Sequence, residues 1–391
     1  MKENQNIKNP GSTSSSQAVS LVRSLKEVLK EFEVRESRGV EDVLGHPFTQ
    51  WPILNDELSG LKPGTLTLVG SWKGYHRKEF MMEWCSGVTQ RSRIPSLFVS
   101  FERPSRELVF RRIARESNLP YSIVATRKML GDPVRKEKLQ AGLQQMASYQ
   151  GLLHLSPGLE QPNVGALENE IRRIGGGPSG RYPIVFIDWL NVMEVEGVQE
   201  EESRICALAR QLKVLAVKYG IPVVAGVDFN KSAQEVRGDA PAQETYIEQM
   251  AGGSQIWQQA DDCFTLSSSG VDSEELNRLL ENLGREKGVD EGVVPAADIF
   301  FLESRSGLEA SAYFSGILFL VALDTGLCVE ICSGTEQEIV RFNRLEKRVQ
   351  ALEEKGVWNF PDHLTQGPVS VETSTQPTEE KEKIKVSVKL T

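Results

Sequence analysis

The sequence predicts an α/β protein in which helices cover both faces of a mostly parallel, doubly wound sheet. Seven short and almost continuously apolar runs lie between residues 65 and 304. Amphipathic stretches such as PSRELVFRRIARESN separate the earlier runs. Strands that are apolar along their whole length are typical of parallel sheets buried on both faces, and their alternation with helices favours the same arrangement.

The predicted strands occupy residues 65–71, 95–102, 151–156, 182–190, 221–229, 261–268 and 297–304. Two more apolar runs, 315–323 and 327–332, flank the tripeptide Asp324-Thr325-Gly326. Turn residues between two apolar runs are typical of a hairpin, so we expect a hairpin to close the sheet.

The N-terminal segment has two predicted parts. Residues 1–16 are polar and rich in serine, which predicts disorder. Residues 17–48 contain a predicted helix and a connector, because Leu21, Leu25, Leu29 and Phe32 recur at helical spacing. An amphipathic helix must bury its apolar stripe, so it packs either on its own domain or on a neighbouring subunit.

The C-terminal segment also has two predicted parts. A helix is expected within residues 333–360, where Phe342, Leu345, Val349 and Leu352 form a seam of two heptads. Both a short coiled coil and packing on the chain's own domain fit this pattern. Residues 361–391 are rich in Pro, Ser, Thr, Glu and Lys and are predicted to be a disordered tail. In its last segment, IKVSVKL, apolar and polar residues alternate, as they do in a strand that adds to the edge of a partner's sheet. A solvated tail is the alternative.

Composition limits the class of protein. The chain has 391 residues and a net charge of −9, so no overall basic field favours nucleic acid, although a local basic channel stays compatible. Cys328 and Cys332 lack a second cysteine pair and a nearby histidine, which favours reduced core thiols over zinc. The N-terminus has no apolar signal region and no run reaches 18 apolar residues, so we expect a cytoplasmic protein without a membrane span.

The candidate site lies at the predicted strand ends. The stretch TLTLVGSWKGYHRKEF joins the first strand to a turn that contains glycine and then to a helix. Glu102 follows the second strand and Asp188 ends the fourth. In an open parallel sheet, ligands bind at the carboxyl ends of the strands. A carboxylate placed there can hold Mg²⁺ through water, so the pattern predicts a nucleotide site.

Several longer stretches resemble one family in collinear order. From residue 17 to about 332 the chain resembles the C-terminal motor domain of the DnaB family of hexameric replicative helicases, which has a RecA-like fold. KaiC-like and RadA-like relatives share this fold and remain alternatives. The segments that carry the resemblance are LNDELSGLKPGTLTLVGS, SLFVSFERPSRELVFRRIARES, PIVFIDWLNVME, LARQLKVLAVKYGIPVVAGVDFNK, GGSQIWQQADDCFTL and FLESRSGLEA.

The resemblance implies ATP and Mg²⁺ as cofactors and assigns roles to residues. Glu102 takes the place of the catalytic glutamate, and Asp188 that of the metal-linked acid. Arg305 stands at the position of the arginine finger that reaches a neighbour's nucleotide. Lys231 and Arg237 lie near the family's DNA loop as candidate contacts to single-stranded DNA.

The resemblance also implies an assembly. The family's linker helix docks on the adjacent subunit and holds the ring, and the helix within residues 17–36 resembles it. We therefore expect a homo-oligomeric ring, or co-assembly with a related subunit. We expect no counterpart of the family's N-terminal primase-binding domain.

The phosphate-binding loop departs from the family pattern. The family's Gly-Lys-Thr falls on His76, Arg77 and Lys78, while Gly70 and Gly74 remain to bind an anion. A phosphate loop needs glycine for close backbone approach, lysine for the phosphate oxygens and a hydroxyl for Mg²⁺. The histidine adds a side chain, the arginine is bulkier than lysine, and the second lysine removes the hydroxyl.

The other strand ends show one further departure. Asp228 replaces the glutamine that senses the γ-phosphate, which adds negative charge near a triphosphate. The resulting expectation is a DnaB-like, RecA-fold protein of DNA replication or repair in which ATP hydrolysis is weak or lost. A functional helicase with an unorthodox loop and a non-catalytic scaffold that recruits partners through its C-terminal helix and tail remain alternatives.

Overall fold

The structure of the chain is a computed structural model that describes residues 24–26, 29–30, 45–72, 76–127, 131–230, 250–268, 278, 281, 297–306 and 316–334. All helices and strands below belong to one unit, which takes in residues 1–271 and 296–345. A second unit, residues 272–295 and 346–391, includes positions 278 and 281 of the described residues. The predicted segments 1–16 and 361–391 lie outside the described residues, as do residues 335–360 of the predicted segment 333–360. Residues 333 and 334 belong to a strand.

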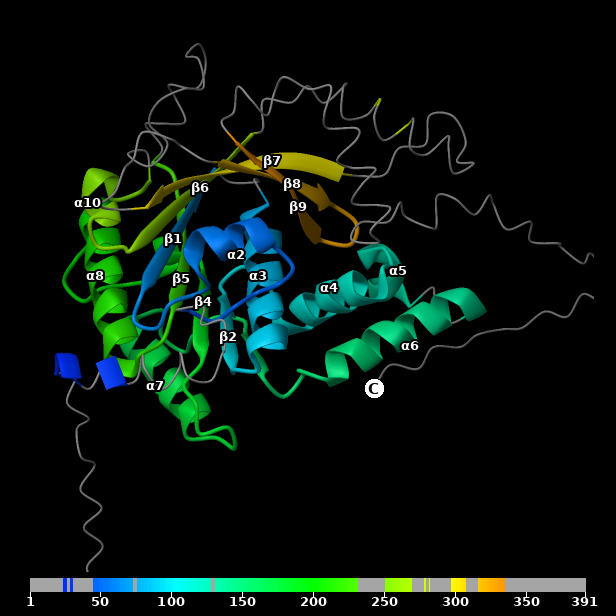
Figure 1. The fold of residues 1–391 in the computed structure, drawn as a ribbon, viewed down its shortest axis with the longest axis horizontal. Helices are drawn as coiled ribbons and strands as arrows, with labels where there is room; N and C mark the ends of the chain where they lie inside the picture. The colour runs from blue at the N-terminus through cyan, green and yellow to red at the C-terminus, as the bar shows by residue number, and fades with distance from the viewer. Residues whose placement is uncertain are drawn as a thin grey trace, which may run out of the picture. The chain divides into compact units, whose positions relative to one another are not determined.

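The strands of the sheet match the predicted apolar runs (Figure 1). They are β1 (Leu66–Ser71), β2 (Ser96–Ser100), β3 (Leu153–Ser156), β4 (Ile184–Asp188), β5 (Val223–Asp228), β6 (Asp262–Ser268), β7 (Ala297–Ser306), β8 (Gly316–Ala322) and β9 (Leu327–Gly334). Within the described residues their order in the sheet is β3-β2-β4-β5-β1-β6-β7-β8-β9. The first six strands of that order pair in parallel, and β6 to β9 pair antiparallel. The predicted mostly parallel sheet and its closing hairpin, β8–β9, are therefore confirmed.

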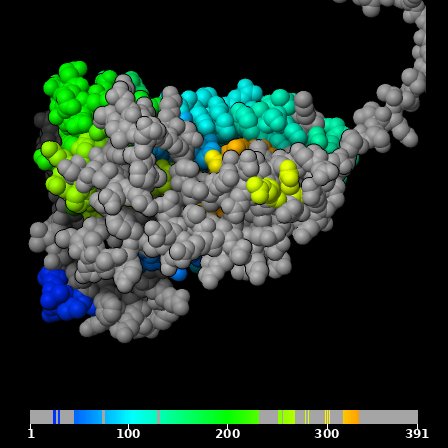
Figure 2. Space-filling model, turned by 90° about the horizontal axis from the view of Figure 1, so that it is seen from above, coloured from blue at the N-terminus to red at the C-terminus, as the bar shows by residue number. Residues whose placement is uncertain are grey.

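The helices lie on both faces of the sheet, as the sequence predicts. They are α2 (Pro52–Leu58), α3 (Arg77–Ser92), α4 (Ser105–Ser117), α5 (Tyr121–Thr126), α6 (Pro133–Ala147), α7 (Val164–Gly175), the short 3-10 helix η2 (Leu190–Val192), α8 (Glu201–Tyr219) and α10 (Gly253–Trp257). Figure 2 shows the fold from above, with α7 and α8 (green) at one end of the view and α4 to α6 (cyan to teal) toward the other.

The face covered by α7, α8 and α10 forms one hydrophobic core. Leu167, Ile171 and Ile174 of α7 recur at helical spacing and are buried there. The side chain of Asn163 accepts a hydrogen bond from the Ala166 amide and so caps the first turn of α7. The cap stabilises the first turn of the helix, and the apolar stripe is buried when the helix packs on the sheet. Both effects favour a helix in this segment.

The opposite face is built around aromatic side chains. Trp51 stacks on Phe80 of α3 with ring centroids 4.6 Å apart, and Phe300 of β7 stacks on Phe319 of β8 at 5.2 Å. Phe80 also meets both phenylalanines edge to face. These contacts join α3 to the antiparallel strands of the sheet.

Two further sequence expectations concern a membrane span and an N-terminal helix. In the part of the chain that the structure describes, no helix is both long enough and apolar enough to cross a bilayer. Residues 25, 26, 29 and 30 are helical, which agrees with the helix expected within residues 17–48. Leu25 and Leu29 are 73% and 49% exposed.

Candidate functional site

The candidate site lies where the ends of β2, β4, β5 and β1 meet the start of α3. These four strands are neighbours and parallel, so their carboxyl ends share one edge of the sheet. Ser71 pairs in register with Asp228, and Ser100 pairs with Asp188. The fold therefore brings Asp188, Asp228 and the nearby Glu102 to the same edge, although they are far apart in sequence.

The backbone at the start of α3 has the conformation that glycine favours. His76 precedes the helix with φ 40° and ψ 13°, in the left-handed region. Its side chain does not cap α3; instead Nε2 lies 2.8 Å from Oδ2 of Asp298 on β7. His76 therefore contacts the antiparallel part of the sheet rather than the acids at the strand ends.

Arg77, the first residue of α3, turns its side chain back onto the strand ends. Its Nε donates to Oδ1 of Asp188 at 3.3 Å, and its Nη1 donates to Oδ1 of Asp228 at 2.7 Å. Nη1 also donates to Ser71 Oγ and to the Val227 carbonyl, both at 3.0 Å. One guanidinium, with its side chain 7% exposed, thus contacts the ends of β1, β4 and β5.

The acid that meets this guanidinium is itself deeply buried. The side chain of Asp188 is 0% exposed, and within the described residues its Oδ2 has no hydrogen-bond partner. Burial raises the pKa of the Asp188 carboxyl, while the charges of Arg77 and Lys78 oppose that rise. Removing one partner of a buried ion pair typically costs about 3–5 kcal/mol, because it leaves an uncompensated charge. Arg77 therefore stabilises the ionised form of the buried Asp188 carboxyl group.

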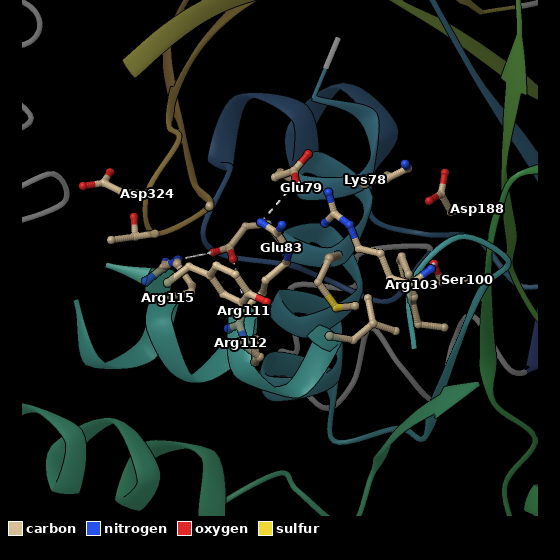
Figure 3. Close-up of a pocket in the computed structure, with 16 residues that line it drawn as sticks. Lys78, Glu79, Glu83, Ser100, Arg103, Arg111, Arg112, Arg115, Asp188 and Asp324 are labelled. Atoms are coloured by element: carbon tan, nitrogen blue, oxygen red, sulfur yellow. Dashed lines mark hydrogen bonds and ion pairs between the residues drawn. The ribbon is translucent and has the colours of Figure 1, made fainter. Parts of the chain in front are cut away.

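The second cation of α3 pairs with the glutamate after β2. Lys78 Nζ forms an ion pair with Glu102 Oε2, and the two side chains are 25% and 31% exposed. Burial lowers the pKa of the Lys78 ammonium, although the charges of Asp188 and Glu79 act in the opposite direction. In Figure 3 the Lys78 side chain extends toward Asp188. The Glu102 carboxylate is thus paired with a cation of the chain itself.

An ion-pair network holds α3 against α4. Glu83 Oε2 lies 2.6 Å from Arg112 Nη1, and Glu83 Oε1 lies 2.8 Å from Arg115 Nη2. Glu79 lies 2.9 Å from Arg103, just after Glu102. Burial would raise the pKa of the Glu83 carboxyl, but Arg115 and Arg112 hold it below its usual range. The acids of α3 and the arginines that face them are drawn in Figure 3.

A cavity of about 380 Å³ opens beside these charged groups. Its lining consists of Ser71, Trp72, His76, Arg77, Lys78, Glu79, Glu102, Arg103, Arg111, Trp189, Asp228 and Leu323. Sequence reasoning missed Trp72, Trp189, Arg103 and Arg111 of this set. Three of them directly follow a predicted strand or a predicted site residue, and this position in the sequence could have identified them as site residues. Arg111 gives no such signal, because only the packing of α4 brings it here.

The remaining predicted site residues divide into two groups. Gly70 lies inside β1, where an added Cβ would sit 2.5 Å from Met250 Cε, so packing explains this glycine. Arg305 lies on β7, in register with Cys263, and its side chain is outside the described part. Gly74, Lys231 and Arg237 lie outside the described residues.

The residues at this edge do not fit the Mg²⁺ that a nucleotide site of this kind uses. Among the described residues, no group of three or more His, Cys, Asp or Glu side chains is placed to hold a metal ion. Asp188, Asp228 and Ser71 already accept hydrogen bonds from Arg77. Two unit charges about 4 Å apart interact by about 4 kcal/mol at an effective dielectric of about 20, so repulsion from the guanidinium would be about twice that for a divalent ion.

The strand order and the site at the strand ends define the class as a RecA-like fold. Solved structures share it, including the following two. One is described as the ATPase domain of its protein, with a TM-score of 0.60, 15% identity, and coverage of 78% of this chain and 98% of that one. The other is a DnaB-like replicative helicase, described together with its interactions with primase, with a TM-score of 0.58, 15% identity, and coverage of 79% and 67%.

The sequence comparisons give the family. The model of the DnaB-like helicase C-terminal domain matches residues 48–282, and the chain belongs to that family. The replicative DNA helicase DnaB of Haemophilus influenzae is 23% identical over 229 residues, which are 58% of this chain and 48% of that protein. The Pasteurella multocida DnaB is 24% identical over 188 residues, 48% of this chain and 39% of its own. The matched region therefore spans less than half the length of each of these relatives.

Proposed function

We propose that this chain is a DnaB-helicase-like protein of DNA replication or repair whose nucleotide site hydrolyses ATP weakly or not at all. Family membership supports the first part. The observation that carries the second part is the pairing of the two cations at the start of α3 with the acids of the site. Arg77 contacts Asp188 and Asp228, and Lys78 contacts Glu102.

The chemistry of phosphoryl transfer explains why these pairs matter. The reaction depends on a metal ion at the phosphates and on a free acid that orients the attacking water. Here the guanidinium covers the metal-linked acid, and an ammonium neutralises the glutamate. Losing a single electrostatic contact to the transition state typically lowers kcat by about 10²–10³. Because both contacts are affected, we expect turnover at least about 10³-fold below that of a working helicase.

Family membership also supports the proposed partners of the chain. We propose that the chain binds single-stranded DNA and assembles as a ring, with copies of itself or with a related subunit that turns over ATP. Both relatives carry the name replicative DNA helicase, which supports a role at replicating or repaired DNA. ATP with Mg²⁺ is the family's nucleotide, and the paired acids of this chain oppose its productive binding.

The test of the proposal is ATP turnover by the full chain with and without single-stranded DNA. We expect a rate that equals the rate of the Glu102→Gln variant, with no stimulation by DNA, because Glu102 already lacks a free carboxylate. A rate comparable to that of a working helicase, abolished by Glu102→Gln, would contradict the proposal and support the functional-helicase alternative.

DNA binding separates the proposal from a scaffold that lacks a nucleic-acid partner. Backbone contacts release counterions, so binding to single-stranded DNA should weaken steeply with salt. Lys231→Ala and Arg237→Ala should each reduce the salt dependence of that binding. Absence of any DNA binding at low salt would support the scaffold alternative instead.

A further inference from the structure

We propose that the Arg77 guanidinium is a built-in replacement for the divalent cation, and that it covers a latent metal site made by Asp188, Asp228, Ser71 and the Val227 carbonyl. This inference deepens the proposed function, because it concerns the same strand ends. The residues do not fit Mg²⁺ because a side chain of the chain itself permanently fills the cation position.

The atoms around the guanidinium are the first observation. Its four contacts are to oxygen atoms, two from carboxylates, one from a hydroxyl and one from a backbone carbonyl. Carboxylate, carbonyl and hydroxyl oxygens are the ligands that hard divalent cations such as Mg²⁺, Mn²⁺ and Ca²⁺ prefer. The cluster therefore has the chemistry of a cation site, and a covalently attached cation occupies it.

The unpartnered oxygen of Asp188 is the second observation. The side chain is fully buried, yet Oδ2 has no partner among the described residues. A buried polar atom without a partner is rare and calls for an explanation, such as an ion that it would otherwise bind. The guanidinium contacts only Oδ1 of this carboxylate, so it replaces part of what a metal with its bound waters would supply.

The path of the Arg77 side chain is the third observation. A Cβ added at Gly226 of β5 would lie 2.8 Å from Arg77 Nε and 3.0 Å from its Cδ. Glycine at this position thus leaves the room through which the side chain crosses β5 to reach Asp188. Two features therefore fit the Arg77 side chain: the oxygen cluster binds its guanidinium, and Gly226 leaves space for the side chain to reach that cluster.

Another buried arginine shows what is specific to Arg77. Arg112 pairs with Glu83 and Glu116 and donates to Tyr149, so its partners come from α3, α4 and the segment after α6. Arg77 instead meets the ends of three parallel strands and lines the cavity of about 380 Å³. Shortening Arg77 would open the oxygen cluster to this cavity, through which a hydrated ion can enter.

The experiment measures Mn²⁺ binding by the full chain without nucleotide, using electron paramagnetic resonance and calorimetry. We expect no specific Mn²⁺ binding by the wild type and one bound Mn²⁺ per chain in Arg77→Ser. Mn²⁺ should also raise the Tm of this variant by about 5 °C or more at saturation, because a ligand that binds the folded state stabilises it.

Two control variants test the location and the cause. Arg77→Lys keeps a cation at the cluster, so it should bind no more Mn²⁺ than the wild type. Adding Asp228→Asn to Arg77→Ser removes one carboxylate ligand and should weaken Mn²⁺ binding at least about tenfold. If Arg77→Ser is unfolded in metal-free buffer, return of its circular dichroism signal on addition of Mn²⁺ supports the inference, and no return contradicts it.

Three results would overturn the inference: Mn²⁺ binding by the wild type at the same affinity, absence of binding by a folded Arg77→Ser, or binding that Asp228→Asn leaves unchanged. These results are independent of ATP turnover. A wild type that hydrolyses ATP efficiently contradicts the proposed function, whereas a variant without a metal site contradicts only the replacement role of Arg77.

Discussion

The two cations at the start of α3 differ in what surrounds them. The Arg77 side chain is 7% exposed and meets a fully buried Asp188, whereas Lys78 and Glu102 are 25% and 31% exposed. Partly exposed pairs are screened by water and contribute little, while a buried charge that loses its partner is costly. The two neighbouring residues should therefore contribute very differently to stability, although both neutralise an acid of the site.

We predict that Arg77→Met lowers the free energy of unfolding by about 3–5 kcal/mol, because it removes the cation that is hydrogen-bonded to the buried Asp188 carboxylate. The matched variant Lys78→Met should lower it by less than about 1 kcal/mol. Urea denaturation of both variants and the wild type measures these differences. Similar losses for the two variants would show that the buried pair contributes no more to the free energy of unfolding than the partly exposed pair.

At the scale of elements, β9 holds the start of α2. Glu330 on β9 accepts hydrogen bonds from the Ile53 amide at 2.9 Å and the Leu54 amide at 2.7 Å. Burial raises the pKa of Glu330 from 4.5 to about 7, although both amides act to lower it. Trp51 just before α2 also donates its indole N–H to the Cys328 carbonyl at 2.9 Å. The contact between α2 and β9 therefore includes a carboxyl group that titrates near neutral pH.

This raised pKa predicts that stability falls as pH rises. The folded state binds the proton more tightly than the unfolded state, so the contribution is complete below 4.5 and is lost as pH rises through about 7. Its full size is on the order of 3 kcal/mol. Thermal or urea unfolding at about pH 5 and about pH 8 measures the loss. Glu330→Gln should remove most of it, and an unchanged pH dependence in that variant would contradict the assignment.

At the scale of the whole molecule, the exposed leucines of the N-terminal helix support the proposed assembly. Leu25 and Leu29 are one helical turn apart and are 73% and 49% exposed. They lie in the segment that resembles the family's linker helix, which docks on the adjacent subunit. An exposed apolar pair of this kind gains stability when a second copy covers it.

We predict that the full chain sediments as an oligomer and that Leu25→Glu combined with Leu29→Glu shifts it toward the monomer. Val134→Glu is the matched control, because Val134 is 47% exposed on α6 and should not affect assembly. Sedimentation velocity at micromolar concentration measures both. A wild-type monomer, or an equal shift in the control, would count against assembly through this helix.

The strands and the general place of the site could be predicted from sequence for a simple reason. Runs such as PIVFIDWL are apolar throughout, and strands that bury every side chain of such a run are typical of a parallel sheet covered on both faces. Parallel strands present their carboxyl ends at one edge, so the acids that end them meet. Asp188 and Glu102 follow from this rule without any knowledge of packing, whereas Asp228 is predicted from the family resemblance.

The contacts that decide the chemistry could not be predicted in this way. The sequence places Arg77 beside His76 and Lys78, but its partners are residues 71, 188 and 228, which come together only because β1, β5 and β4 are neighbours in the sheet. Arg111 reaches the cavity through the packing of α4, and Gly226 makes room for a side chain from another element.

By itself the sequence determined the strands, their alternation with helices, the strand-end acids and the family resemblance, because each depends on local pattern and chain order. Only the tertiary structure decided that the two cations at the start of α3 neutralise those acids. That outcome depends on the order of strands in the sheet and on the space left by Gly226, neither of which is written in any local stretch of residues.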